Sequence, residues 1–219
     1  QVVALLREAR SLGLGWIHDI VPNHMALDSQ NRMLMDVLEF GKLSPYYEFF
    51  DITWSSPVSK QFLPLTIPIL HQPFEKELQE GRITIGVAPD HLALTYDTFD
   101  LPLAITSYVL LVEAIDDLWH TSSHEARSHL ERVRSLAEEL RNLGQGDHAS
   151  YKPARNVRDR LVATFKVSRH LEAALRRLSQ PSGQEFRSRL ARAQNFRLEP
   201  ANVDPLKINY RRFAHINSL

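Results

Sequence analysis

The side chains best suited to chemistry lie close together near the start of the sequence. Asp19 lies in the short apolar run 15–21, which Pro22 ends, and Asn23 and His24 follow directly. An imidazole can donate a hydrogen bond to a substrate hydroxyl, and a carboxylate can orient a cation or a sugar hydroxyl. The alternative is that the amide and the imidazole only satisfy the turn after a strand.

The elements around these side chains suggest where they lie. Residues 15–21 predict a buried strand, because the run is short, apolar and partly β-branched. An amphipathic helix is expected before it, over residues 2–12, with Gly13 at its end. A helix, a glycine-containing turn and a buried strand form part of an α/β unit. In parallel α/β barrels, catalytic groups gather at the carboxyl ends of the strands.

Residues 31–101 predict an irregular region with a small β component. Two prolines make residues 61–70 extended but unsuited to a central strand. Alternating apolar residues on both sides of Pro89 and Asp90 predict a hairpin over 82–97. Short helices are expected over 30–40, closed by Gly41, and over 72–80.

The next region, residues 102–197, is expected to be helical. Ser122 or Ser123 is suited to cap one of its helices, with Glu125 as an acid in the first turn. The expected helices cover residues 105–118, 123–143, 153–178 and 184–194. The tail after them has one run that favours a strand, 208–213.

Composition excludes several classes of protein. The chain has 219 residues and no cysteine, which excludes disulfide scaffolds and cysteine zinc sites. No apolar run reaches the roughly 18 residues that cross a membrane, and the first residues lack the features of a secretory signal. We therefore expect a soluble, cytoplasmic protein with no membrane partner.

The net charge of zero combines an acidic and a basic segment. Residues 1–120 carry 7 basic and 16 acidic side chains, whereas residues 121–197 carry 16 and 8. We expect these segments to dock on each other. A nucleic-acid backbone is the other partner for such arginines, but no aromatic residues or known motif accompany them, so no nucleic acid is expected. The arginines considered are Arg155, Arg158, Arg160, Arg169, Arg176 and Arg177.

The spacing of the histidines and acidic residues does not suggest a metal site. His120, His124 and His129 have helical spacing but lack acidic or cysteine companions. No acidic loop beside Asn23 would complete a calcium cage. We expect no metal and no cofactor.

The order Asp-x-x-x-Asn-His after an apolar strand resembles the first conserved region of the α-amylase superfamily of glycoside hydrolases and transglycosylases. The run DIVPNHMA (19–26) looks more specifically like the maltooligosyl trehalose synthase family. Met33 and Met35 stand where that family usually has tryptophans, so an aromatic sugar platform is expected to be missing there. Three further stretches resemble the family in the same order: NRMLMDVLEFG (31–41), PYYEFFDITW (45–54) and INYRRF (208–213).

The resemblance implies an intramolecular transglycosylation on a maltooligosaccharide substrate. The reducing-end α-1,4 bond becomes an α,α-1,1 trehalose linkage through a covalent glycosyl intermediate. It implies that His24 contacts the sugar whose bond is cleaved and that Asp19 helps to orient the site. We assign five residues to substrate binding: Asp19, Asn23, His24, Tyr210 and Arg211. A structural strand with surface arginines is the alternative for the last two.

The catalytic carboxylates of this family have no counterpart in the sequence. Its nucleophile lies in an Arg-x-Asp-x-x-x-His segment, which does not occur in the 219 residues. The resemblance implies that the nucleophile and the acid/base glutamate follow Leu219. We therefore expect no catalytic residue in this chain, which is then an inactive internal fragment whose partner is the rest of the same enzyme.

The expected fold is mainly α with a small β component (α+β), a segment of a TIM (β/α)8 barrel plus a largely helical insertion domain. Two functional alternatives stay open: another glucan hydrolase or transglycosylase of the superfamily, or a non-catalytic helical module that binds glucan or a protein. The expected divisions are a barrel segment (1–30), an irregular and β-hairpin part (31–101), a helical insertion (102–197) and a return towards barrel strand four (198–219).

Overall fold

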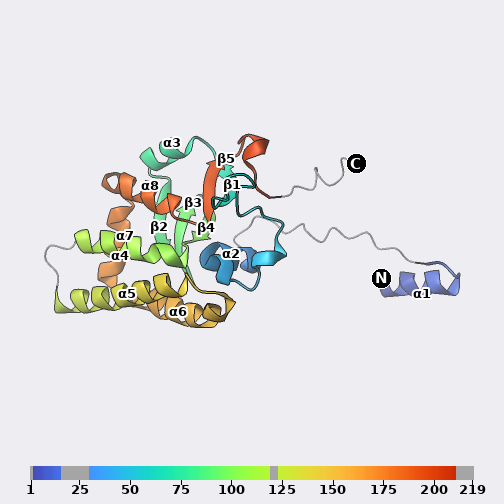
Figure 1. Ribbon diagram of the computed structural model, residues 1–219, viewed down its shortest axis with the longest axis horizontal. Coiled ribbons are helices and arrows are strands. Elements are labelled where there is room, and N and C mark those ends of the chain that lie inside the picture. The colour runs from blue at the N-terminus through green and yellow to red at the C-terminus, as the bar shows by residue number, and fades with distance from the viewer. Residues whose placement is uncertain (1, 16–29, 119–122, 211–219) are drawn as a thin grey trace.

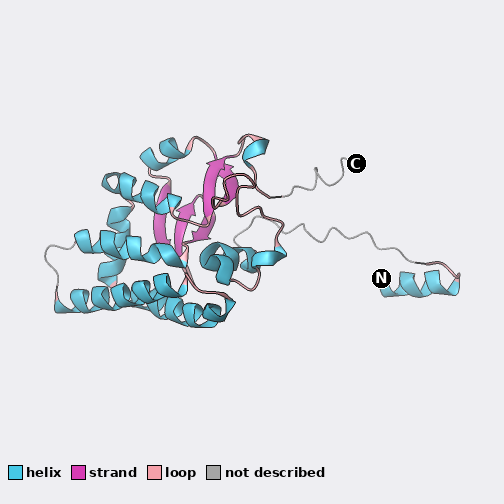
Figure 2. Cartoon of the chain, viewed as in Figure 1, coloured by secondary structure: helices cyan, strands magenta, loops and turns pink. Residues whose placement is uncertain are grey.

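The computed structural model describes residues 2–15, 30–118 and 123–210 (Figure 1). Helices form most of the regular structure in these residues, and two small sheets lie among them (Figure 2). The expected fold class, mainly α with a small β component, is confirmed for this part of the chain. The predicted strand over 15–21 falls outside the described residues except for Gly15, so the barrel segment and the domain boundaries stay predictions.

The first helix, α1 (Val2–Ser11), confirms the helix expected over residues 2–12. Gly13 follows it with a φ of 68°, a conformation that glycine adopts without strain. Val3, Leu5 and Leu12 on and after α1 are exposed. The apolar side of α1 is therefore not covered by other described residues.

Two small sheets hold the five strands of the described residues. β2 (Ile83–Val87), β3 (Leu92–Tyr96) and β4 (Phe99–Pro102) form an antiparallel meander, in which Ile83 lies opposite Tyr96. This confirms the predicted hairpin over 82–97. The second sheet pairs β1 (Leu65–Leu70) in parallel with β5 (Phe196–Pro200). β1 has this single strand neighbour within the described part, as expected from its prolines.

Helices surround the sheets and share one core with them. α4, α5 and α6 lie side by side, while α3 lies beside α8 (Figure 2). Buried side chains join the layers, for example Ile83 of β2, Leu111 of α4 and Val133 of α5. The helices are α2 (Arg32–Phe40), α3 (Phe74–Gln79), α4 (Tyr108–Asp117), α5 (His124–Leu143), α6 (Tyr151–Val167), α7 (Arg169–Leu178) and α8 (Gln184–Arg192).

Helix α2 is held at both ends by local chemistry. The Asn31 side chain accepts a hydrogen bond from the backbone of Leu34 (3.2 Å), which caps the first turn. Gly41 ends the helix with a φ of 55°. A side chain at that position would approach Asn195, whose amide donates to the Leu38 carbonyl (2.8 Å). The end of α2 is therefore tied to the residue just before β5.

The single helix predicted over residues 153–178 is wrong. The chain forms α6 and α7 instead, with a break at Ser168, whose backbone is extended (φ −96°, ψ 101°). The Ser168 hydroxyl accepts from the Leu171 backbone and so caps α7. Serine favours such caps over helix interiors because its side chain competes for backbone hydrogen bonds. The apolar stripe continued across the break and concealed it.

The tail holds a strand that was not predicted, β5 (Phe196–Pro200). The run 208–213 contributes one isolated bridge, at Tyr210, among its described residues, and its residues 211–213 lie outside them. β5 is short and ends at a proline, which weakened its pattern. Its partner β1 is distant in sequence: Arg197 of β5 donates to Thr66 of β1, 131 residues away.

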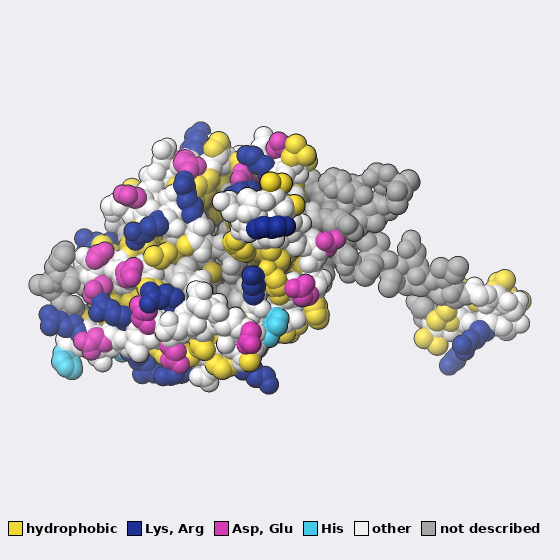
Figure 3. Space-filling model, viewed as in Figure 1, with side chains coloured by type: hydrophobic (Ala, Val, Ile, Leu, Met, Phe, Trp, Pro, Cys, Tyr) yellow, Lys and Arg dark blue, Asp and Glu magenta, His cyan; other side chains and the backbone are white. Residues whose placement is uncertain are grey.

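The acidic and basic segments of the chain pack together. Three ion pairs among the described residues join them: Asp116–Arg134, Glu39–Arg158 and Glu75–Arg192. On the face in Figure 3, basic and acidic side chains are interspersed over the helices and do not form two separate patches. Within the described residues, no helix is both long and apolar enough to cross a membrane.

Candidate functional site

Of the five predicted substrate-binding residues, Tyr210 alone is described. Asp19, Asn23, His24 and Arg211 lie outside the described residues. Their grouping into one site therefore stays a prediction.

Tyr210 lies at a junction between the tail and the segment 45–54, PYYEFFDITW, which is rich in aromatic residues. It is half-buried, packs against the core and forms an isolated antiparallel bridge with Ile52. The neighbouring Asn209 accepts a backbone hydrogen bond from Thr53 (2.7 Å). Its side chain accepts from the Thr66 backbone (2.9 Å) and donates to the Pro64 carbonyl (3.1 Å). These bonds fix the backbone position from which the tail continues towards Arg211.

A stack of three aromatic rings lies beside this junction. Trp54 stacks between Tyr47 (centroids 5.0 Å apart, 17° between planes) and Phe62 (6.0 Å, 5°). Phe62 is 50% exposed. Burial raises the pKa of Tyr47 to about 12, and the charge of Glu48 adds to this shift. Residues 31–101 were predicted to be largely irregular, and the ring stack was not predicted, because ring stacking depends on contacts between separate turns.

A large polar cavity of about 740 Å³ lies between α2, the β2–β3 turn, β4 and α6; we call it the α2–α6 pocket. Charged, aromatic and thioether side chains share its wall. These side chains include Arg32, Met33, Met35, Asp36, Glu39, Tyr46, Asp90, His91, Asp100, Tyr151, Arg155 and Arg158. Met33 is exposed and Met35 is buried.

A buried ion pair forms the floor of this pocket. Glu39 is 4% exposed and Arg158 is 6% exposed. One Glu39 oxygen lies 3.2 Å from Arg158, and the other accepts a hydrogen bond from the Tyr108 hydroxyl (3.1 Å). Arg158 also donates to the Asp90 carbonyl and lies 5.3 Å from the Phe40 ring centroid. This pair connects α2 and α6 to the β2–β3 turn.

Burial sets the protonation of Glu39. Removal from water raises its pKa to about 8, although the positive charge of Arg158 opposes the shift. Burial therefore opposes the negative charge of this carboxyl group, and Arg158 favours it. Asp90 at the rim behaves differently: burial opposes ionisation, but the hydrogen bond with His91 and the charge of Arg158 keep its pKa below the ordinary value.

The second α2 carboxylate is also held by protein groups. Asp36 accepts from the Ser44 hydroxyl (2.5 Å) through Oδ1 and from the Tyr151 hydroxyl (2.7 Å) through Oδ2. Each oxygen of Asp36 and of Glu39 already has a protein partner. These two carboxyl groups are therefore better suited to shaping a binding site than to attacking a substrate. Burial and this bond raise the pKa of Tyr151 to about 12.

The α2–α6 pocket was not predicted from the sequence. Arg158 was considered together with five other arginines of the basic segment, and its almost complete burial was not predicted. One signal was present: Glu39 lies between Leu38 and Phe40 on the buried side of α2, where a carboxylate requires a partner. The identity of that partner was not readable, because it lies on α6.

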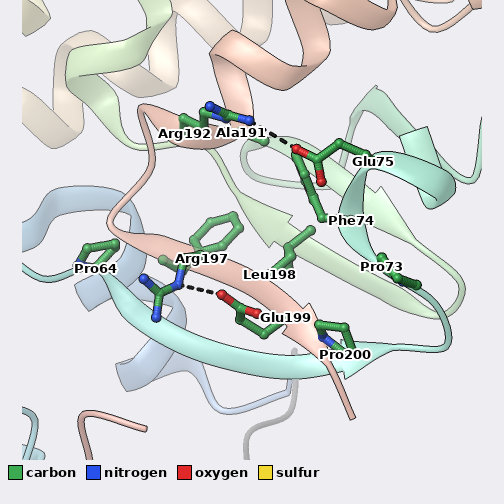
Figure 4. Close-up of a pocket in the computed structure, with 11 residues that line it drawn as sticks. Pro64, Pro73, Phe74, Glu75, Ala191, Arg192, Arg197, Leu198, Glu199 and Pro200 are labelled. Carbon is green, nitrogen blue, oxygen red and sulfur yellow. Dashed lines mark hydrogen bonds and ion pairs between the residues drawn. The ribbon is translucent and has the colours of Figure 1, made fainter. Parts of the chain in front are cut away.

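A second cavity, of about 490 Å³, lies between α3, α8 and β5 (Figure 4). Phe74 and Leu198 contribute apolar surface to it, and the ion pair of Glu75 with Arg192 (3.0 Å) crosses from α3 to α8. Both members of that pair are more than half exposed. Pro64, whose carbonyl accepts from the side chain of Asn209 beside Tyr210, also lines this α3–α8 cavity.

Metal-ligating side chains do not gather in the described part of the chain. No group of three or more His, Asp or Glu side chains there is arranged to hold an ion.

Comparisons with known proteins point to one group of enzymes. A scan against models of protein families gave no match. A stretch of 59 residues is 49% identical to proteins described as maltooligosyl trehalose synthases from two strains of Mycobacterium tuberculosis. Over that stretch, the chain is homologous to maltooligosyl trehalose synthase. The stretch is 26% of this chain and 8% of each mycobacterial protein, so the match spans a small part of the relatives' length.

A solved structure carries a related name. The DSM5389 glycosyltrehalose synthase aligns with 97% of this chain and with 19% of its own length, at 24% identity and a TM-score of 0.44. The resemblance to maltooligosyl trehalose synthase inferred from the sequence motifs is thus confirmed by the mycobacterial relatives. Each of these relatives is a longer protein than the chain described here.

Proposed function

We propose that this chain is part of an enzyme that converts the reducing-end α-1,4 bond of a maltooligosaccharide into an α,α-1,1 trehalose linkage. The observation that carries the proposal is the 49% identity over 59 residues to maltooligosyl trehalose synthase. The motif DIVPNHMA (19–26) supports it, because its carboxylate, amide and imidazole suit contacts with sugar hydroxyls.

In this proposal, residues 1–30 supply a helix and the third strand of a (β/α)8 barrel, whose carboxyl end carries the substrate contacts. His24 contacts the sugar at the cleaved bond, while Asp19 and Asn23 orient the site. Tyr210 and Arg211 form part of its wall. The side-chain hydrogen bonds of Asn209 to the backbone of Thr66 and Pro64 support this role for the tail, because they hold the neighbouring Tyr210 in one place.

The carboxylates that make and break bonds are assigned to the rest of the same enzyme. A retaining mechanism needs a nucleophile and an acid/base residue that face each other across the anomeric carbon. Asp36 and Glu39 are committed to protein partners, which supports leaving them out of these roles. No cofactor is required, because the reaction exchanges one glycosidic bond for another.

The test is a chimaera in which residues 1–219 replace the homologous stretch of a mycobacterial synthase. Incubated with maltopentaose, the chimaera is expected to remove reducing ends, since an α,α-1,1 linkage has no free anomeric hydroxyl. A hydrolase would instead create reducing ends, and a binding module would leave their number unchanged. A folded chimaera, verified by its thermal unfolding, that does not consume reducing ends contradicts the proposal.

A substitution in the same chimaera tests the motif. His24→Ala is expected to lower the rate of reducing-end loss about a hundredfold, because a hydrogen bond to the reacting sugar is lost in the transition state. His124→Ala is the matched control, since His124 is exposed at the start of α5. Equal rates for the two variants would show that His24 does not contact the reacting sugar.

A further inference from the structure

The α2–α6 pocket has the size of a ligand site. Its volume of about 740 Å³ is within the range of about 300–1,000 Å³ that small-molecule sites occupy. Its wall comes from three separate stretches of chain, around α2, the β2–β4 meander and α6. The Tyr151–Asp36 hydrogen bond (2.7 Å) and the Glu39–Arg158 pair join α6 to α2 across a sequence distance of more than a hundred residues. Contacts between distant parts of the chain therefore hold the walls of the pocket together.

The charges of the wall balance. Arg32, Arg155 and Arg158 are positive, and Asp36, Asp90 and Asp100 are negative. Glu39 adds a buried carboxyl group, whose pKa burial raises and whose nearest charged partner is Arg158. A wall with equal numbers of interspersed positive and negative groups gives no net attraction to an anion or a cation, and it favours a neutral polar ligand.

The wall offers both donors and acceptors to such a ligand. Asp100 uses Oδ1 to accept from Thr95 (2.7 Å), and within the described residues its Oδ2 makes no hydrogen bond. Arg155 lies near Tyr151 and Asp36 and is exposed. The His91 side chain is 14% exposed, and its buried Nε2 has no hydrogen-bond partner in the described part of the chain. A carboxylate and a guanidinium on one wall are suited to pairs of adjacent hydroxyl groups.

The same wall offers apolar contacts beside these groups. Met33 is 38% exposed, and Tyr46 is half-buried. Met35 is buried behind them at 8% exposure. A thioether and an aromatic ring adapt to an apolar surface of irregular shape. A pyranose presents this combination, with hydroxyl groups around its edge and C–H groups on its faces.

We propose that the α2–α6 pocket binds a glucosyl unit of an α-glucan, with Asp100 and Arg155 bonded to its hydroxyl groups and Met33 and Tyr46 against its ring. The glucan as substrate class rests on the proposed function, whereas the residues assigned to sugar binding here are other than Asp19, Asn23 and His24. The pocket holds the sugar and takes no part in bond exchange, because Asp36 and Glu39 are occupied by protein donors.

The three methionines of the chain allow a direct test. Met33 and Met35 line the pocket, and Met25 follows His24 in the predicted substrate motif. The protein is labelled with ¹³C on its methionine methyl groups, and Met33→Leu and Met35→Leu assign the signals. Added maltotriose is expected to shift the Met33 and Met35 signals along one saturable curve. Unmoved Met33 and Met35 signals, or a shift of the Met25 signal alone, would overturn the proposal.

Matched variants locate the binding. Asp100→Asn and Arg155→Gln are each expected to weaken maltotriose binding about tenfold, since each loses one charge-assisted hydrogen bond. Arg192→Gln, in the exposed pair of the α3–α8 cavity, is expected to leave the curve unchanged. Equal binding by all three variants overturns the proposal. So does inorganic phosphate that shifts the same signals and displaces maltotriose, because the pocket is then an anion site.

This experiment and the chimaera test fail independently. A chimaera that forms trehalosyl product while Met33 and Met35 do not respond to maltotriose rejects the pocket and keeps the proposed function. A pocket that binds maltotriose in a protein whose chimaera leaves reducing ends unchanged keeps the pocket and rejects the function.

Discussion

Two arginines are buried in the described residues, and they are satisfied in different ways. Arg158 of α6 meets a carboxylate, Glu39, as well as a backbone carbonyl. Arg187 of α8 is fully buried and bonds to carbonyl oxygens, those of Leu178 (2.8 Å), Gln180 (2.5 Å) and Leu78 (3.2 Å). A carboxylate can lose its charge by binding a proton, but a carbonyl cannot.

The contrast explains where each arginine lies. α7 ends at Leu178, where the last carbonyls of a helix lack intrahelical partners and carry partial negative charge. Arg187 supplies donors to these carbonyls and ties α8 to α7 and α3. Burial lowers the pKa of Arg187. Arg158 instead connects two walls of the α2–α6 pocket through a side chain whose charge depends on pH.

The largest loss of stability is expected from Arg187→Met. Three carbonyl acceptors lose their donor at once, two of them in buried hydrogen bonds, so we expect a loss of about 3–5 kcal/mol in the free energy of unfolding. Urea unfolding followed by circular dichroism measures it. Arg187→Lys keeps the charge with fewer fixed donors and should recover part of the loss. A loss below about 1 kcal/mol for Arg187→Met would show that the carbonyls find other partners.

Arg158→Met is expected to cost less, about 2–3 kcal/mol near pH 6. The reason is that the Glu39 left behind can stay neutral with its proton and keep its bond from Tyr108. Arg155→Met, one turn earlier on the exposed side of α6, is the matched control and should change stability by less than about 0.5 kcal/mol. If Arg158→Met costs more than Arg187→Met in the same urea titrations, the proposed difference between the two sites is wrong.

The pH dependence of stability isolates Glu39. Its pKa is about 8 in the folded protein against an ordinary value of 4.5, so the unfolded chain releases this proton first. The contribution of Glu39 is therefore fully present below about pH 4.5 and is lost as the pH rises through about 8. Glu39→Gln removes it, so the stability of the unaltered protein relative to this variant should decline steadily from pH 5 to pH 8. Parallel profiles would mean that Glu39 is ionised in the fold.

The sequence contained the local part of this fold. A cap for α5 was predicted at Ser122 or Ser123, because a cap involves residues three apart, and it is the Ser123 side chain that accepts from Ala126 (3.2 Å). The β2–β3 hairpin was readable for the same reason, with its turn at Pro89 and Asp90. The break at Ser168 was not, since a continuous apolar stripe outweighed one serine.

The two candidate sites also differ in how far the sequence alone could reveal them. The motif around Asn23 and His24 was visible because it is contiguous, although its geometry lies outside the described residues. The α2–α6 pocket was not visible, because its wall joins α2 to residues on α6; the Tyr151–Asp36 bond alone spans 115 residues. Charge counting pointed to contact between the acidic and basic segments, but it could not choose Arg158 as the buried partner.

The smallest effect is expected at the exposed counterpart of the buried pair. Glu75 and Arg192 are 3.0 Å apart, the same separation range as Glu39 and Arg158, but their side chains are 63% and 69% exposed. Water screens the attraction, and two long side chains lose freedom when they pair, so Glu75→Gln should cost less than about 0.5 kcal/mol. Added salt should reduce even this effect, whereas it should leave the Arg158→Met loss unchanged. An effect of Glu75→Gln as large as that of Arg158→Met would mean that separation, and not burial, decides the strength of the ion pairs between the acidic and basic segments.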